Sequence, residues 1–162
     1  PVYRPLYELN EDFGFCASPD DCYTALRGIR SLTARLDTHQ RHALAVARWL
    51  DDRPEVAAVL HPALATSPGH ALWKRDFTGA SGLFSFRLGG AMATRSDAFV
   101  DRLSLFGIGA SWGGYESLAL PFDSSAQSPG QGARMIRLHI GLESPADLIA
   151  DLDQALDHVR SG

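Results

Sequence analysis

The segment that most constrains the fold is MIRLHIG, residues 135–141, because its apolar residues alternate with polar or charged ones. Alternate side chains of a β-strand point to opposite faces, so Arg137 and His139 share one face. The other face carries three apolar residues: Ile136, Leu138 and Ile140. A strand with one apolar face packs that face against a second layer. The segment therefore predicts a sheet with one covered side.

Two helix-start signals lie on either side of this strand pattern along the chain. The tetrapeptides SPDD (18–21) and SPAD (144–147) each combine a capping serine, a proline suited to the first helical position and acidic side chains near the positive helix end. They predict one helix that runs to about residue 32 and another that runs to about residue 160.

The remaining chain adds weaker patterns of the same kinds. Further helices are predicted at residues 33–53, at 71–77 and from 94–96 to about 105. Further strands are predicted at residues 56–60, 83–88 and 117–120. The glycine-rich segment 107–114 and the polar segment 121–134 predict loops. Together these elements predict a two-layer α/β sandwich.

The length and composition suit one domain. The chain has 162 residues, 45% of them hydrophobic, and a formal net charge of -4. No basic cluster stands out, so we expect neither a nucleic-acid nor a membrane surface. The apolar runs fall far short of the roughly 20 residues that span a bilayer, and the N-terminal residues lack a signal-peptide pattern. We therefore expect a cytoplasmic protein.

The cysteines and histidines show no metal-binding pattern. Cys16 and Cys22 fit no zinc-ligand spacing, and His39 and His42 share a helical face without an acidic partner beside them. We expect free thiols and no metal site.

Lysine is the rarest charged residue of this chain. Lys74 is the only lysine, against fourteen arginines. Chemistry that forms a Schiff base with a lysine must therefore use Lys74 or a residue outside this chain. The charged neighbours of Lys74, in the sequence WKRDF, indicate a surface segment.

The sequence GASWG, residues 109–113, matches the G-x-S-x-G pattern of serine hydrolases, with Ser111 in the place of the nucleophile. Asp123 and His139 follow in the chain order that such enzymes use. That pattern needs a strand before the serine and a helix after it, whereas a loop and then a strand are predicted here. We favour a loop whose backbone approaches a ligand, and a serine hydrolase remains the alternative.

Arg137 is the candidate ligand-binding residue of the strand predicted at residues 135–140. An arginine on a central strand is costly to bury without an anion, and its planar fork matches a carboxylate. The pattern leaves two interpretations open, a carboxylate ligand or an ion pair with an Asp or Glu of the protein. We interpret His139, on the same face, as a structural histidine.

Five segments together carry a resemblance to a known family. They are RGIRSL (27–32), PGH (68–70), WKRDFTGASGLFSF (73–86), SWGGYESL (111–118) and IRLHIGLE (136–143). In this order they resemble the C-terminal domain of the Cys/Met-metabolism family of pyridoxal-phosphate enzymes, in the branch of the cystathionine β-lyases. The resemblance extends from about residue 20 to residue 159.

The resemblance implies a fold, a cofactor and an activity. In fold type I enzymes a large N-terminal domain holds pyridoxal phosphate on a lysine, and a small C-terminal domain, a mainly antiparallel sheet covered by helices, closes the site. Residues 1–17 would be a linker or helix tail from that upstream domain and residues 18–162 the small domain. The complete enzyme would be a homo-oligomer, a tetramer, that cleaves L-cystathionine to homocysteine, pyruvate and ammonia. This chain alone would be inactive, because it lacks the Schiff-base lysine and any other catalytic residue.

The resemblance also assigns roles to individual residues. Arg137 matches the arginine that holds the substrate α-carboxylate, and Ser111 and Trp112 match the loop beside it. γ-Acting relatives carry an acidic residue before this serine and a leucine after it, whereas this chain has Ala110 and Trp112. Trp112 favours the β-lyase branch, and Ala110 marks a position of substrate specificity. A non-catalytic carboxylate-binding or oligomerisation module built on Arg137 is the alternative.

Overall fold

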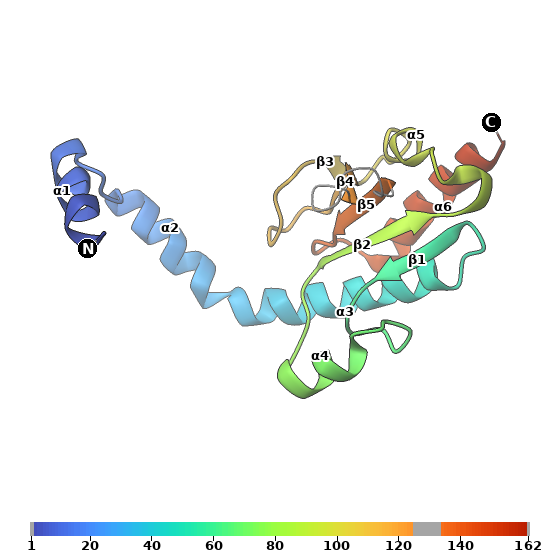
Figure 1. Ribbon diagram of the computed structural model, residues 1–162, viewed down its shortest axis with the longest axis horizontal. Helices are drawn as coiled ribbons and strands as arrows, with labels where there is room; N and C mark the ends of the chain where they lie inside the picture. The colour runs from blue at the N-terminus through green and yellow to red at the C-terminus, as the bar shows by residue number, and fades with distance from the viewer. Residues whose placement is uncertain (1, 125–133, 162) are drawn as a thin grey trace. The chain divides into compact units, whose positions relative to one another are not determined.

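The computed structural model describes residues 2–124 and 134–161, which form two compact units, Pro1–Thr33 and Ala34–Gly162 (Figure 1). The first unit contains helices α1 (Tyr3–Phe13) and α2 (Pro19–Arg30). The Ser18 side chain accepts a hydrogen bond from the Asp21 backbone N–H at 3.1 Å, which confirms the predicted helix cap. Among its described residues, neither helix buries a side chain.

The second unit is built on a five-stranded sheet of order β1-β2-β5-β4-β3. The strands are β1 (Val56–Leu60), β2 (Leu83–Leu88), β3 (Gly107–Ile108), β4 (Leu118–Asp123) and β5 (Arg134–His139). Neighbouring strands are antiparallel except β3 and β4, which are parallel. The mainly antiparallel sheet is therefore confirmed. The two-residue strand β3 lies inside the segment predicted to be a loop, so that prediction was wrong at residues 107 and 108.

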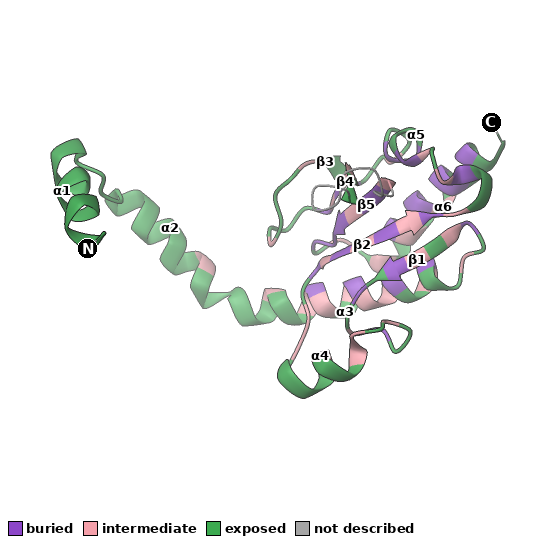
Figure 2. Cartoon of the chain, in the orientation of Figure 1, coloured by how far each residue is buried: buried purple, intermediate pink, exposed green. Residues whose placement is uncertain are grey.

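Helices cover one face of this sheet and complete the two-layer fold. They are α3 (Leu32–Asp51), α5 (Ser96–Val100) and α6 (Pro145–Ser161), whereas α4 (His70–Asp76) buries no residue and is not part of the core. A short 3-10 helix lies at Gly90–Met92. The apolar sides of α3 and α6 form one core with alternate residues of β2 and β5, which are the buried segments of Figure 2. The largest fully buried residues of the sheet are Phe86, Leu88, Ile136 and Leu138, and Ile140, directly after β5, is fully buried as well.

The other face of β5 departs from the simple alternation. Arg137, predicted on this face, is half-buried, but Met135 and His139 are buried, His139 with 2% of its surface exposed. In the sheet Arg137 lies opposite Ser85 of β2 and Leu120 of β4, which places it on the central strand. Arg137 is thus the one side chain of this face of β5, among residues 135–139, that solvent reaches.

The helix predicted to run to residue 105 ends at Val100. The reason is a contact distant in sequence, because the carboxylate of Asp151 on α6 accepts hydrogen bonds from the backbone N–H groups of Ser104 and Leu105. These bonds, at 2.8–3.0 Å, hold residues 104 and 105 in a turn before β3.

The predicted loop 121–134 is shorter than expected. Strand β4 continues to Asp123, and β5 begins at Arg134, where the two residues form an ion pair of 3.3 Å across the strands. The prediction was therefore wrong at both ends, and residues 125–133 lie outside the described part of the chain.

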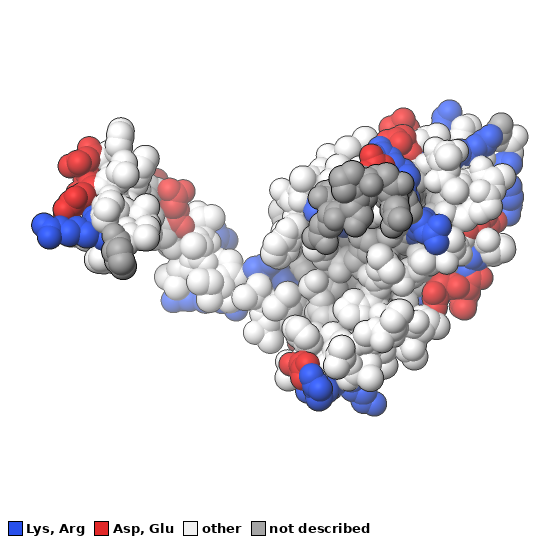
Figure 3. Space-filling model, viewed as in Figure 1, with Lys and Arg blue, Asp and Glu red and all other residues white. Residues whose placement is uncertain are grey.

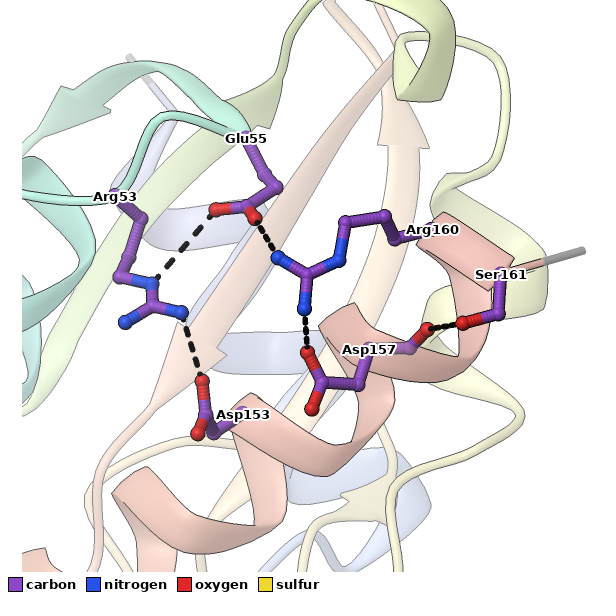
Figure 4. Close-up of polar contacts among 6 residues, drawn as sticks. All are labelled: Arg53, Glu55, Asp153, Asp157, Arg160 and Ser161. Atoms are coloured by element: carbon purple, nitrogen blue, oxygen red, sulfur yellow. Dashed lines mark hydrogen bonds and ion pairs between the residues drawn. The ribbon is translucent and has the colours of Figure 1, made fainter.

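A cluster of charged side chains joins the start of β1 to the end of α6 (Figure 4). Glu55, 8% exposed, lies 2.8 Å from Arg160 and 3.7 Å from Arg53. Arg53 and Arg160 in turn contact Asp153 and Asp157 of α6. In this cluster each buried or half-buried charge has a partner of opposite sign, as a stable fold requires.

The surface charges have both signs. On the face of the larger unit seen in Figure 3, acidic and basic side chains lie mainly toward the edge, around a largely uncharged centre. Within residues 2–124 and 134–161, no helix combines the length and apolarity needed to cross a membrane.

Candidate functional site

The loop of residues 109–117 connects β3 to β4 and lies against the end of β5. Its first part is held by Arg137, whose Nη2 donates a hydrogen bond of 2.7 Å to the backbone carbonyl of Ala110. Arg137 is therefore in contact with the residue that immediately precedes Ser111 and Trp112. The structure brings the predicted ligand-binding and specificity residues into one place.

In the described part of the chain, Arg137 lacks an acidic partner, as does the half-buried Arg95, which binds the Val159 carbonyl, whereas the half-buried Arg53 and Arg134 form ion pairs. Among the described residues no Asp or Glu forms an ion pair with Arg137, and residues 125–133 contain no acidic residue. A guanidinium has five N–H donors, and the Ala110 carbonyl takes one of them. The interpretation of Arg137 as a member of an internal ion pair thus finds no support in the geometry.

Ser111 and Trp112 lie exposed at the surface. Trp112 has 65% of its surface exposed, and Ser111 is exposed as well. The next residue, Gly113, has φ +83°, a backbone conformation that residues with a side chain rarely adopt. Gly114 has no such φ, and a Cβ there would meet no atom within 4 Å, so the conformational need for glycine rests on Gly113.

His139 lies under the second part of the loop. Its Nε2 is 3.2 Å from the Gly114 carbonyl, and the Gly113 N–H lies 3.1 Å from Nε2 and 3.4 Å from Nδ1. The Gly113 carbonyl accepts a further hydrogen bond of 3.0 Å from Arg35 of α3. His139 was predicted to be a structural histidine, and its ring contacts the backbone of the loop.

A second histidine supports the ring of His139 from α3. The ring of His39 packs edge-on against His139, with centroids 5.2 Å apart, and His39 is 1% exposed. Burial, followed by the neighbouring His139 and Arg35, lowers the pKa of His39. His39 is therefore neutral at pH 7. Arg35 and His39 are four residues apart, so they share one face of α3.

The end of the loop is fixed by Glu143. Its carboxylate accepts hydrogen bonds of 2.8 Å from both the backbone N–H and the hydroxyl of Ser117, and that hydroxyl accepts one from the Gly141 N–H. A Cβ on Gly141 would lie 2.2 Å from the Tyr115 carbonyl. Sequence reasoning missed the structural roles of Ser117 and Glu143, although both belong to segments that carry the family resemblance.

The geometry does not assemble a serine-hydrolase triad. No helix follows Ser111 within the described residues before β4 begins at Leu118. Leu118 pairs with His139, whereas Asp123, five residues further along β4, pairs with Arg134. At about 3.3 Å per residue, Asp123 and His139 are roughly 16 Å apart along the strands. The match to G-x-S-x-G is therefore a loop without the partners that activate a serine.

The spacing of the cysteines and histidines predicted no metal site. In the described part of the chain, no group of three His, Cys, Asp or Glu side chains is arranged to hold a metal ion. Cys16 and Cys22 are exposed free thiols.

Comparison with known proteins identifies the family. The family model of the Cys/Met metabolism PLP-dependent enzymes matches residues 2–157. The chain belongs to this family. The resemblance read from the five sequence segments is thereby confirmed, and so is pyridoxal phosphate as the cofactor of the family.

Relatives within the family have different names. A cystathionine beta-lyase of Bordetella avium is 50% identical over 161 residues, which cover 96% of this chain and 40% of that protein. An L-alanine/L-glutamate racemase of Wolbachia pipientis wMel is 43% identical, with the same two coverages. The solved cystathionine gamma synthase of Xanthomonas oryzae pv. oryzae, in complex with cystathionine, is 39% identical, with a TM-score of 0.81 over 93% of this chain and 41% of that one. This member of the family thus spans about 40% of the length of the curated relatives it matches.

The one lysine and the candidate arginine of this family member have different surroundings. Lys74, the only lysine, is exposed on α4. Arg137, by contrast, is half-buried beside the loop of residues 109–117, and among the described residues its guanidinium donates to the Ala110 carbonyl alone.

Proposed function

We propose that this chain is the part of a pyridoxal-phosphate-dependent C–S β-lyase that binds the substrate α-carboxylate. The complete enzyme would convert L-cystathionine and water to homocysteine, pyruvate and ammonia. Arg137 holds the carboxylate, and Ser111 and Trp112 lie beside it. The lysine that carries the cofactor would come from outside these 162 residues.

One observation supports the proposal above the others. Arg137 is half-buried on the central strand of the sheet, and its one hydrogen bond within the described residues goes to the Ala110 carbonyl. A half-buried guanidinium without an acidic partner is electrostatically incomplete. A carboxylate that accepts two parallel hydrogen bonds from its fork would complete it.

The choice of a β-lyase rests on two residues and on the relatives. Trp112 follows Ser111 and Ala110 precedes it. The family resemblance implies a leucine and an acidic residue at these two positions of γ-acting relatives. The Bordetella relative named as a β-lyase is 50% identical, against 43% for the racemase and 39% for the γ-synthase.

The test of the carboxylate role is a pair of substitutions in the complete enzyme. Lysine keeps the charge and loses the fork, so Arg137→Lys should lower kcat/KM for L-cystathionine, and Arg137→Ala should lower it further. Loss of one charge-assisted contact corresponds to a decrease of roughly 10- to 100-fold. Cofactor occupancy, measured by absorbance, should stay unchanged. Near-normal kcat/KM in the alanine variant would contradict the proposal.

A product analysis tests the type of lyase. Cleavage on the β-carbon side of cystathionine releases pyruvate and homocysteine, whereas cleavage on the γ-carbon side releases 2-oxobutyrate and cysteine. The proposal predicts pyruvate as the main oxo acid from the complete enzyme. Predominant 2-oxobutyrate, or racemisation of alanine without a lyase reaction, would contradict it.

We also propose how the chain is placed in the complete enzyme. Residues 1–17 would be the linker or helix tail of the upstream cofactor domain and residues 18–162 the small domain, in a cytoplasmic homotetramer. The apolar residues that α1 exposes would be covered by the upstream domain or by another subunit, which supports this placement: Tyr3, Leu6, Tyr7, Leu9 and Phe13. Light scattering coupled to size-exclusion chromatography should give the mass of four subunits, and a monomer would contradict this part of the proposal.

A further inference from the structure

The backbone around Ser111 and Trp112 is held on both sides, although their own side chains are exposed. Before them, the Ala110 carbonyl accepts a hydrogen bond of 2.7 Å from Arg137. After them, the Gly113 and Gly114 backbone contacts His139, and Arg35 binds the Gly113 carbonyl at 3.0 Å. Both ends of this two-residue segment are therefore fixed by side chains from β5 and α3.

The ring of His139 lies between a backbone acceptor and a backbone donor. Its Nε2 is 3.2 Å from the Gly114 carbonyl, which can only accept a hydrogen bond. The Gly113 N–H, which can only donate, lies 3.1 Å from Nε2 and 3.4 Å from Nδ1. An imidazole offers both a donor and an acceptor to this backbone, and an apolar side chain of similar size offers neither.

The two ends of the segment respond differently to a ligand. Arg137 binds the Ala110 carbonyl with the same guanidinium that we propose for the substrate, so its contact with the loop is shared when a carboxylate binds. The contacts of His139 and Arg35 with residues 113 and 114 do not involve the ligand-binding face of Arg137. They can keep the loop in place in both states.

We propose that His139 and Arg35 are positioning residues, which hold Ser111 and Trp112 over Arg137 before the ligand arrives. This inference rests on the proposed carboxylate role of Arg137. A loop that is already in place binds its ligand without the cost of ordering the backbone. Loss of the two backbone contacts of His139 should therefore weaken substrate binding about five- to thirty-fold.

Fluorine NMR on the 162-residue chain, labelled with fluorotryptophan, tests the positioning without any reaction. The chain contains three tryptophans, and Trp112→Phe identifies the loop signal. We expect His139→Leu to change the shift and narrow the line of Trp112 alone, and His139→Gln, which keeps one donor and one acceptor, to restore them in large part. Arg35→Gln, at a half-buried position, should have the same effect on Trp112 as His139→Leu.

His61→Leu is the matched control, because His61 is a buried histidine that packs on Phe84 and binds the Ala63 N–H away from the loop. It should leave the Trp112 signal unchanged. An unchanged Trp112 signal in both His139→Leu and Arg35→Gln would overturn the inference. So would changes of all three tryptophan signals that His61→Leu reproduces.

The kinetic readout separates this inference from the proposed function. In the complete enzyme, His139→Leu should raise KM for L-cystathionine more than it lowers kcat, and His139→Gln should return KM toward normal. If Arg137→Ala has normal kcat/KM while His139→Leu still mobilises Trp112, the carboxylate role fails and the positioning of the loop stands. If Arg137→Ala is defective and His139→Leu changes neither KM nor Trp112, the positioning fails alone.

Discussion

On one face of β5, Ile136 and Leu138 are fully buried against helices, whereas on the other face Arg137 is half-buried and, among the described residues, binds a backbone carbonyl alone. The covered face depends on close packing with α3 and α6. The open face depends on a loop held by polar side chains. Changes to the first face should therefore lower the stability of the fold, and changes to the second should lower the binding of a ligand.

The largest effect on stability is expected on the covered face. Leu138→Ala should lower the free energy of unfolding by about 2–5 kcal/mol, because it leaves a cavity in a core that has no solvent access. Urea denaturation of the 162-residue chain measures this value. A loss similar to that of an exposed leucine, such as Leu72→Ala on α4, would contradict the difference between the two faces.

A buried charge with a structural role should affect stability and leave activity intact. Glu55→Gln removes the carboxylate that faces Arg53 and Arg160, and should lower the free energy of unfolding by about 1–3 kcal/mol. The value is below that of a fully buried pair because Arg160 is largely exposed. Asp157→Asn, at an exposed position, is the control. A fall in kcat/KM of the complete enzyme with Glu55→Gln would contradict the prediction that Glu55, unlike Arg137, affects stability alone.

Two buried histidines should make stability depend on pH. Burial is the largest cause that lowers the pKa of His39 and of His61 below the ordinary value of 6.5. As the pH falls, the unfolded chain then binds protons before the folded chain does. The contribution of these histidines to the free energy of unfolding is therefore complete above pH 6.5 and is lost as the pH drops through the lower folded pKa values. Asp97, whose pKa Arg134 lowers, affects stability only in the more acidic range below its ordinary 3.8.

Denaturation curves between pH 7.5 and pH 5.5 should therefore show decreasing stability, with a smaller decrease in His61→Leu. The same slope in the native chain and in this variant would show that His61 does not contribute. His158, exposed on α6, provides a control substitution that should leave the slope unchanged.

Local signals in the sequence predicted much of this fold. The cap at Ser18 and the apolar face of β5 follow from neighbouring residues, and both are confirmed. The end of α5 could not be predicted, because it depends on Asp151, some fifty residues away in the sequence. The continuation of β4 to Asp123 depends likewise on pairing with Arg134.

The candidate site, too, was predicted where local signals sufficed and missed where contacts distant in the sequence decide. Alternation in the strand singled out Arg137, and the family resemblance added Ser111 and Trp112. The role of each of these residues remains a proposal. The burial of His139 was missed, because it results from a loop that crosses β5 and from His39 on α3. The spacing of Arg35 and His39 on one helical face is a signal in the sequence, but only the fold shows what that face contacts.

The most direct test of the account pairs the guanidinium of Arg137 with the carboxylate of a ligand. Inhibition constants of the complete enzyme are measured for an amino acid and for the amine that lacks only its α-carboxylate, with the native enzyme and with Arg137→Ala. The account predicts that loss of the carboxylate weakens binding roughly 10- to 100-fold in the native enzyme and only slightly in the variant, because the two groups interact with each other. An equal loss in both enzymes would show that the carboxylate binds elsewhere and would contradict the central claim.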